Sequence, residues 1–250
     1  MKKYLLSLIL LFFSSEVFAD KLKIAVGLWI PPYVIRDEAR GIEYDILKET
    51  LALAGHEMVP RYVPLARTLA ELRSGQVDGI MSTGLTDLPG CYTNTHITYW
   101  NYAITLSSNN IQIDSIKDLK GRTIMAFQNA RNYLGEDYRQ MTHGNKLYKE
   151  IGDQSSQNKL LFSKRVEVVI ADQFIFQWFN RSPEVLKTIK KAPEVTYHEI
   201  FPPSRFQSVF LRQDVCDSFN IALKELKNSG RYDEIVASYG VTNVSDSLIN

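Results

Sequence analysis

The sequence has few of the residues that mark catalytic or metal-binding sites. It contains two cysteines and four histidines, and no histidine has a partner at the spacing of a metal site. No Gly-x-Ser-x-Gly, phosphate-binding P-loop or Gly-x-Gly-x-x-Gly motif occurs. The carboxylates are scattered, and Glu43 and Glu71 are interpreted as residues on helix surfaces. We therefore expect no metal, no cofactor and no enzymatic activity.

Only one long apolar run is present, and it lies at the N-terminus. Met1–Lys3 is basic, Tyr4–Phe13 is almost entirely apolar, and Val17 and Ala19 occupy positions that signal peptidase reads. This pattern predicts a secretory signal that is cleaved after Ala19, because the run is too short to remain as a membrane-spanning helix. We expect residues 20–250 to form the exported protein.

Charge of either sign is not in excess, and cysteine is scarce. The net charge is +1, and removal of residues 1–19 makes the chain neutral, which gives no support for binding to nucleic acid or to a membrane surface. Cys91 and Cys216 enter an oxidising compartment on export, where one disulfide can form. The sequence does not give the distance between them, so a bridge and two free thiols are both open.

Predicted strands alternate with predicted helices along the chain, which indicates an α/β fold with parallel sheets and helical flanks. A break near Leu106–Asn110 divides the elements into two runs, and this favours two lobes. The last ten residues have no periodicity and are predicted to form a tail. The predicted strands are 21–27, 58–63, 77–83, 99–106, 122–127, 166–171, 195–200 and 208–212. The predicted helices are 41–55, 66–74, 115–121, 132–141, 153–164, 173–179, 214–228 and 232–239.

Three short polar segments follow predicted strands. Ligands of parallel sheets bind at the carboxyl ends of strands, where the N-termini of helices present unpaired N–H groups. The first segment is Ser82–Thr86, the second is Gln128–Arg131, and the third is Asp172. These segments are the first candidates for a ligand site.

Several stretches, in this order, resemble the bacterial periplasmic solute-binding proteins of the polar-amino-acid type, also called extracellular solute-binding family 3. They are "LKIAVGLWIPPYVI", "GIEYDIL", "LRSGQVDGIMS", "SIKDLKGRTIMAFQ", "RVEVVIAD" and "ALKELKNSGRYDEIVASYG". The resemblance implies a type II periplasmic-binding fold, in which two lobes of mixed, mostly parallel sheet are joined by two hinge crossings. It places residues 20–107 and 207–250 in lobe one and residues 108–206 in lobe two. The crossings are then expected near Leu106–Asn109 and Pro203–Gln207.

The resemblance also implies roles for individual residues. Ser82, Thr83, Gly84 and Thr86 would present hydroxyls and amides to a ligand's head group, and Asp172 would pair with its amino group. Asp172 also has a local alternative, which is to cap the helix that follows it. Since a lone carboxylate in a closed cleft needs a cationic partner, the ligand role of Asp172 predicts a ligand with an amine or another cation.

The arginine that holds the ligand's carboxylate in this family is missing from its usual position. Arg67 and Arg131 are the two candidates to replace it, and the choice between them is open. Asn129 and Ala130 stand beside Arg131 at a predicted helix start. Trp29 and Tyr33 lie near the position where the family stacks an aromatic ring on the ligand, although that position itself aligns with Ile30, and core packing is the alternative for both.

These features together predict a monomeric periplasmic receptor that captures an amino acid, an amine or a related small polar solute for an inner-membrane ABC permease. Two alternatives use the same fold. One is a ligand sensor that acts on a membrane partner, and the other is a periplasmic enzyme of the dehydratase type.

Overall fold

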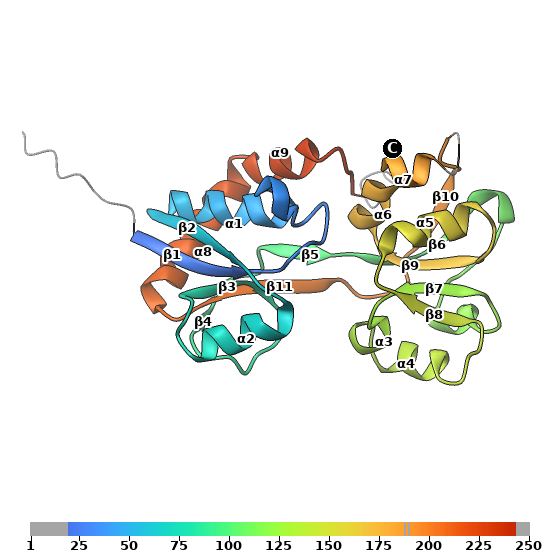
Figure 1. Cartoon of the computed structure of the whole chain (residues 1–250), viewed down its shortest axis with the longest axis horizontal. Helices are drawn as coiled ribbons and strands as arrows, with labels where there is room; N and C mark the ends of the chain where they lie inside the picture. Colours follow the sequence, from blue (N-terminus) through green and yellow to red (C-terminus); the bar gives the residue numbers. More distant parts are fainter. Residues whose placement is uncertain (1–19, 188, 190, 244–250) are drawn as a thin grey trace, which may run out of the picture.

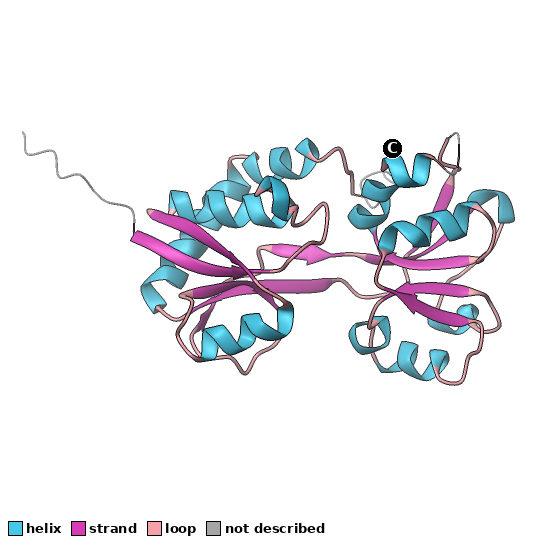
Figure 2. Cartoon of the chain, in the orientation of Figure 1, coloured by secondary structure: helices cyan, strands magenta, loops and turns pink. Residues whose placement is uncertain are grey.

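The computed structural model describes residues 20–187, 189 and 191–243. These residues form two lobes that lie side by side along the long axis of the molecule (Figure 1). Each lobe has one sheet with helices packed on it (Figure 2). The predicted signal segment, residues 1–19, lies outside the described residues. In the described part of the chain, no helix is long and apolar enough to cross a bilayer.

Lobe one is built on a mixed sheet with the strand order β2-β1-β3-β11-β4, and β5 pairs with β11. The pairs β1–β2 and β1–β3 are parallel, whereas β11 runs antiparallel to its neighbours. The strands are β1 (Asp20–Val26), β2 (His56–Tyr62), β3 (Gly79–Thr83), β4 (Cys91–Tyr92), β5 (Ile97–Tyr99) and β11 (Ser204–Phe210). The helices are the short 3-10 turn Arg36–Glu38, α1 (Ile42–Leu53), α2 (Leu65–Arg73), α8 (Gln213–Asn228) and α9 (Arg231–Ser238).

Lobe two is built on a second mixed sheet with the order β10-β6-β9-β7-β8. Its pairs β7–β8 and β7–β9 are parallel, and β6 runs antiparallel to both β9 and β10. The strands are β6 (Asn101–Leu106), β7 (Ile124–Phe127), β8 (Tyr148–Ile151), β9 (Val168–Asp172) and β10 (Val195–His198). The helices are the 3-10 turns Ser107–Asn109 and Ile116–Leu119, α3 (Ala130–Tyr133), α4 (Glu136–Thr142), α5 (Gln154–Phe162), α6 (Gln173–Asn180) and α7 (Pro183–Leu186).

The first crossing between the lobes lies earlier in the chain than the sequence predicted. The single strand expected over 99–106 is two strands, because β5 pairs with β11 in lobe one while β6 pairs with β9 in lobe two. The chain therefore crosses at Trp100, and the predicted crossing near Leu106–Asn109 is wrong. The return crossing lies just before Ser204, where β11 begins its pairing with β5. Hydrophobic periodicity is continuous through Trp100, so it cannot mark the change of sheet.

Two short strands and one helix break were also missed. The helix predicted over 132–141 is divided into α3 and α4 by Gly135, which has a φ of 91°, a conformation that glycine adopts readily. Strands β4 and β8 were not predicted. Both residues of β4 are half-buried, and in β8 only the first residue, Tyr148, is buried. Neither strand therefore shows the alternation of buried and exposed residues that signals a strand.

The predicted C-terminal tail begins with a docked segment. Val241 is buried, and Gln177 on α6 exchanges two hydrogen bonds with the backbone of Thr242 at 2.8 and 2.9 Å. Gln173 adds a third bond, from its Nε2 to Oδ1 of Asn243. The end of lobe one is thereby attached to a helix of lobe two, a contact that no pattern in the sequence predicted.

The two cysteines form a disulfide within lobe one. Cys91 on β4 is bonded to Cys216 on α8, with 6.2 Å between their Cα atoms. Of the two alternatives that the sequence left open, the structure has the bridge. It fastens the outermost strand of the sheet to the longest helix of the lobe.

Candidate functional site

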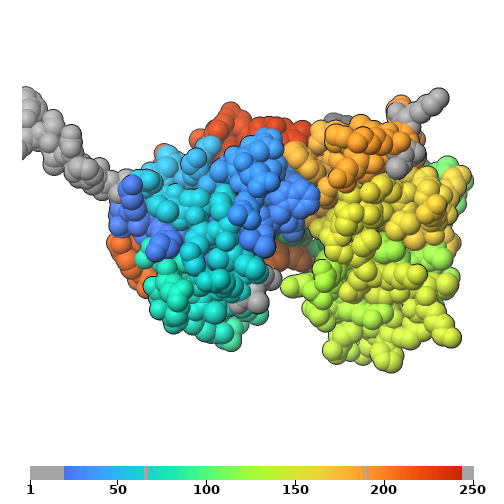
Figure 3. Space-filling model, viewed as in Figure 1, coloured from blue at the N-terminus to red at the C-terminus, as the bar shows by residue number. Residues whose placement is uncertain are grey.

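The carboxyl ends of the parallel strands of both lobes point toward the opposite lobe. Thr83, at the end of β3, is paired with Gln207 close to the start of β11, where the chain has just crossed. Asp172, at the end of β9, is paired with Asn101, the first residue after the other crossing. Figure 3 shows a notch between the lobes on the side where Figure 1 places α2 and α3. This interlobe face is the candidate site.

The segment after β3 brings hydroxyl and backbone groups to the lobe-one side of this face. Thr83 is buried, and its Oγ1 accepts a hydrogen bond from Leu85 N–H at 3.0 Å. Ser82 is half-buried, whereas Gly84 and Thr86 are exposed. A Cβ on Gly84 would lie 3.6 Å from the Phe206 ring, so the loop passes directly over an aromatic side chain of β11. The position of these four residues agrees with the sequence prediction, and their contact with a ligand stays a prediction.

Arg67 belongs to a three-residue charged cluster at the start of α2. Its Nε donates to Glu71 at 2.8 Å, and Arg61, at the end of β2, binds the same carboxylate through Nε and Nη2. The bond from Arg61, followed by that from Arg67, lowers the pKa of Glu71 to about 2. Because two arginines share one carboxylate, the cluster keeps one net positive charge. The Arg67 side chain is 61% exposed, so this charge is accessible.

Arg131, the other candidate for a carboxylate contact, points into lobe two. Its guanidinium donates to the hydroxyl and the carbonyl oxygen of Thr142, both at 3.1 Å, and lies 4.5 Å above the Tyr148 ring. These contacts engage the side chain away from the interlobe face. The prediction that Arg131 meets a ligand is therefore not supported by its orientation.

The N–H groups at the start of α3 are also occupied. The carboxylate of Glu150 accepts from the backbone N–H of Asn129 at 2.8 Å and of Arg131 at 3.1 Å. Burial acts to raise the pKa of Glu150, but these bonds and one from the Tyr148 hydroxyl outweigh it and leave the pKa below its ordinary value. Asn129 is exposed and Ala130 is buried. The turn predicted to receive a ligand's carboxylate thus holds a carboxylate of the protein.

Asp172 lies at the junction of the two lobes, and its side chain is enclosed. Its carboxylate caps α6 by accepting from the N–H groups of Phe174 and Ile175 at 2.9 and 3.1 Å. It also accepts from Trp100 N–H at 3.0 Å and from the Tyr33 hydroxyl at 3.0 Å. The residue is only 2% exposed. The enclosed position does not support the expectation that Asp172 pairs with a ligand's amino group, and the helix-cap alternative is the one observed.

Burial determines the protonation of this group. Removal from water raises the pKa of Asp172 to about 6, and the hydrogen bonds from Ile175, Tyr33, Trp100 and Phe174 only partly oppose this rise. Burial, followed by the nearby Asp172 charge, raises the pKa of Tyr33 well above its ordinary value. The tyrosine hydroxyl therefore remains a donor to the carboxylate at physiological pH.

A second enclosed carboxylate, Glu43, lies behind Tyr99. The Tyr99 hydroxyl donates to Glu43 at 2.9 Å, and His96 Nε2 lies 3.2 Å from the same carboxylate. The Tyr99 ring stacks on Tyr33 with 4.0 Å between ring centroids, which links this group to Asp172. Glu43 is 1% exposed and Glu71 is 3% exposed, so the interpretation of both as helix-surface residues is wrong. Glu43 binds residues distant in sequence, and Glu71 binds a pair of arginines. The periodicity of a helix does not predict such contacts.

The two aromatic candidates occupy different environments. Tyr33 is completely buried, as the core alternative predicted. Trp29 is 60% exposed, and its ring meets Phe179 of α6 edge-on, with 6.3 Å between centroids. Trp29 thus reaches from lobe one to lobe two and keeps most of its surface accessible. Among the residues that the structure describes, no group of His, Cys, Asp and Glu could hold a metal ion.

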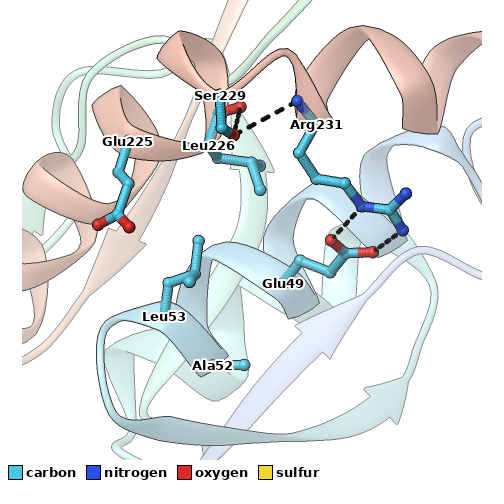
Figure 4. A pocket seen from close by; sticks show the side chains of 7 residues that line it. All are labelled: Glu49, Ala52, Leu53, Glu225, Leu226, Ser229 and Arg231. Atoms are coloured by element: carbon cyan, nitrogen blue, oxygen red, sulfur yellow. Dashed lines mark hydrogen bonds and ion pairs between the residues drawn. The ribbon is translucent and has the colours of Figure 1, made fainter.

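A separate surface groove of about 440 Å³ lies at the far end of lobe one (Figure 4). It is lined by Glu49, Ala52, Leu53, Glu225, Leu226, Ser229 and Arg231. Arg231 binds Glu49 through two bonds of 2.8 Å. Helix α1 starts near the interlobe face and ends at Leu53, so this groove is a seam between helices on the opposite side from lobe two.

Solved structures share this arrangement over nearly the whole chain. Substrate-binding domain 2 of GlnP from Lactococcus lactis, in an open conformation, is 22% identical with a TM-score of 0.62, and the match covers 88% of this chain and 95% of that domain. The arginine-, lysine-, histidine-binding protein ArtJ from Geobacillus stearothermophilus is 17% identical with a TM-score of 0.61, over 92% and 100% of the two chains. The chain has the type II periplasmic-binding fold.

The same fold also occurs in a signalling protein. A histidine kinase sensor domain with similarity to periplasmic binding proteins is 14% identical with a TM-score of 0.65, and the match covers 90% of this chain and 99% of the domain. No family model matches the chain, and no curated protein matches its sequence. At these identities, the similarity establishes the type II fold.

Proposed function

We propose that this chain is a periplasmic solute-binding receptor that captures an amino acid or a related small solute between its lobes. The observation that carries the proposal is the interlobe face, where the carboxyl ends of β3 and β9 point toward the opposite lobe across an open notch. Polar segments at the ends of parallel strands are the usual ligand positions in α/β folds. The resemblance in fold to amino-acid-binding domains of transporters supports the same function.

Arg67 is the residue that we assign to the ligand's carboxylate. It lies at the start of α2, which follows the carboxyl end of β2, and it carries the accessible part of the Arg61–Glu71–Arg67 charge. Guanidinium groups bind carboxylates with two parallel hydrogen bonds. Thr86 and the backbone of Gly84 are assigned to the same head group because both are exposed on the neighbouring loop.

In this proposal the receptor is monomeric, binds without chemical change and delivers its ligand to an inner-membrane ABC permease. Ligand that contacts both lobes stabilises a closed arrangement relative to an open one. The signal for export, residues 1–19, supplies the periplasmic location. The disulfide Cys91–Cys216 is consistent with an oxidising compartment.

Sensing is the second candidate, and the similarity to a histidine kinase sensor domain favours it. Both functions use the same ligand-binding event and differ in the membrane partner. Cross-linking of the ligand-loaded protein in membranes separates them, since a permease subunit is expected for transport and a kinase for sensing.

Native mass spectrometry of the purified mature protein tests the receptor proposal directly. We expect a small molecule to be carried through purification. The identified compound should increase the free energy of unfolding by RT ln(1 + [L]/Kd), and so raise the melting temperature. The compound should be recovered unchanged after prolonged incubation. Recovery of a converted product would instead support the enzyme of the dehydratase type.

A further inference from the structure

Among the residues that the structure describes, the interlobe face presents a cation and apolar side chains, and its enclosed carboxylates are already bound by groups of the protein. We propose that the ligand is a small carboxylic acid with an apolar or aromatic body, and that it binds without the help of an ammonium group. This inference rests on the proposed receptor function. This choice differs from the amine that the sequence predicted.

The first support is the state of Asp172. Four donors surround its two oxygens, namely the Tyr33 hydroxyl and the N–H groups of Trp100, Phe174 and Ile175. A carboxylate offers about four lone-pair positions, so these donors fill it. Tyr33 is itself completely buried and stacked on Tyr99. An ammonium group could reach Asp172 only by displacing a packed ring.

Three other carboxylates near the interlobe face, those of Glu150, Asp153 and Asp87, also have partners within the protein. Glu150 holds the N–H groups at the start of α3, and Asp153 caps α5 through Ser155. Asp87, which follows Thr86, lies 3.7 Å from Arg73 at the far end of α2. An ammonium group brought between the lobes would lose hydration without gaining an equivalent acceptor from these groups, which is unfavourable.

The second support is the net positive charge of the Arg61–Glu71–Arg67 cluster. Arg61 binds Glu71 through both Nε and Nη2, whereas Arg67 binds it through Nε alone and is the more exposed of the two arginines. The end of the Arg67 guanidinium therefore has donors for a second carboxylate. This arrangement attracts an anion and repels a cation.

The third support is the distribution of exposed apolar side chains. Nine large apolar side chains are exposed in the described part of the chain, and three of them, apart from Trp29 on the α6 side, follow strands β1, β3 and β7 at the carboxyl ends that meet the interlobe face. These three are Leu28, Leu85 and Tyr133. Single exposed apolar residues are ordinary, but several on the segments that border the interlobe face favour a surface that binds apolar groups. A ligand with an aromatic body would cover these side chains on closure.

Three compounds that differ only in their charged groups test the proposal. They are 3-phenylpropionate, L-phenylalanine and 2-phenylethylamine, titrated by calorimetry into the mature protein after unfolding and refolding to remove any carried solute. We expect 3-phenylpropionate to bind at least about tenfold more tightly than L-phenylalanine, a difference that calorimetry resolves easily, and 2-phenylethylamine to give no heat of binding. Equal or tighter binding of L-phenylalanine, or any binding of the amine, would overturn the proposal.

A pair of leucine variants tests the apolar surface. Leu85→Ser should weaken 3-phenylpropionate at least about fivefold. Leu147→Ser serves as the control, because Leu147 is exposed to a similar degree, 47% against 46% for Leu85. It precedes the amino end of β8, whereas the candidate site lies at the carboxyl ends of the strands. Equal affinities of the two variants would contradict the assignment of the apolar surface.

Failure of this inference can be distinguished from failure of the receptor proposal. If the purified protein carries an amino acid or an amine and ignores 3-phenylpropionate, the ligand class is wrong and the receptor proposal stands. If no solute is carried, and no amino acid, acid or amine of a broad panel shifts the melting temperature, both proposals are wrong.

Discussion

Asp172 shows how one side chain can serve two lobes at once. It ends β9, caps α6 and accepts a hydrogen bond from Tyr33, which belongs to the other lobe. Burial of this ionised carboxylate is costly, and its raised pKa of about 6 expresses that cost. The residue therefore acts as a structural link whose stabilising effect depends on pH.

Replacement of Asp172 by Asn should remove a pH-dependent part of the stability. A folded-state pKa above the ordinary value means that the protonated form is favoured by folding. The contribution is fully present below about pH 4 and is lost as pH rises through about 6. The stability of the wild type relative to Asp172→Asn should thus fall by about 2–3 kcal/mol between pH 4 and pH 7. Urea unfolding at several pH values measures this difference.

Asp153→Asn is the control for that experiment. Asp153 also caps a helix, α5, but it is exposed; partial burial acts to raise its pKa, and hydrogen bonds from Ser156 and Ser155 outweigh this and leave the pKa below its ordinary value. The decline between pH 4 and pH 7 should persist in this variant. A profile of Asp172→Asn that runs parallel to the wild type would refute the role of Asp172.

Arg67→Ala should weaken ligand binding while leaving the fold intact. The side chain is exposed and contributes one of the three bonds that hold Glu71, so Arg61 keeps the carboxylate paired. We expect affinity for the carried ligand to fall about tenfold to a hundredfold, since a charge-assisted hydrogen bond contributes about 1.5–3 kcal/mol. Arg73→Ala, at the other end of the same helix, is the control and should bind normally in calorimetry.

Among the elements of lobe one, β4 and α8 depend on each other through the disulfide. Strand β4 has two residues, Cys91 and Tyr92, and pairs only with β11 among the described strands. Such a short edge strand has little hydrogen bonding of its own. Its attachment to Cys216, a buried residue of the sixteen-residue helix α8, holds it in place.

The double variant Cys91→Ser, Cys216→Ser should therefore be less stable than the wild type. The loop that the bridge closes is long, with a sequence separation of 125, and loss of such a bridge is expected to cost about 2–4 kcal/mol. Chemical denaturation of the variant, and of the wild type with and without reductant, measures the loss. An unchanged midpoint in both experiments would show that the bridge does not contribute to stability.

For the molecule as a whole, the relative position of the lobes rests on more than the two crossing strands. The segment after α9 docks on α6 through Gln177 and Thr242, and Tyr33 and Trp29 reach from lobe one to Asp172 and Phe179. All of these contacts lie along α6. The notch in Figure 3 opens on the other side, toward α2 and α3, so closure is expected to bring those two helices together.

Gln177→Ala should loosen this interlobe attachment. The variant loses two hydrogen bonds, which corresponds to about 1–3 kcal/mol if each contributes a typical amount. Small-angle scattering of the ligand-free variant should give a larger radius of gyration than the wild type. Gln213→Ala is the control, because the Gln213 side chain bonds to Asp217 within the same helix, α8, and its loss should leave the scattering unchanged.

The sequence by itself determined the local structure and the class of fold. Apolar residues with helical spacing, such as Ile42, Ile46 and Leu47, form the buried face of α1 within the helix predicted over 41–55, and short apolar runs form most of β7 and β9. These patterns follow from burial of one face of each element, which short stretches of sequence record. The order of the motifs was sufficient to indicate two lobes.

Only the tertiary structure decided how the site is built. Tyr33 and Asp172 are 139 residues apart, Glu43 and His96 are 53 apart, and the sequence contains no pattern that pairs them. The same is true of Glu150, which fills the start of α3 from a neighbouring strand. A polar residue at the end of a strand can face a ligand or accept hydrogen bonds from other groups of the protein. Which of these occurs depends on which distant groups the fold brings within hydrogen-bond distance.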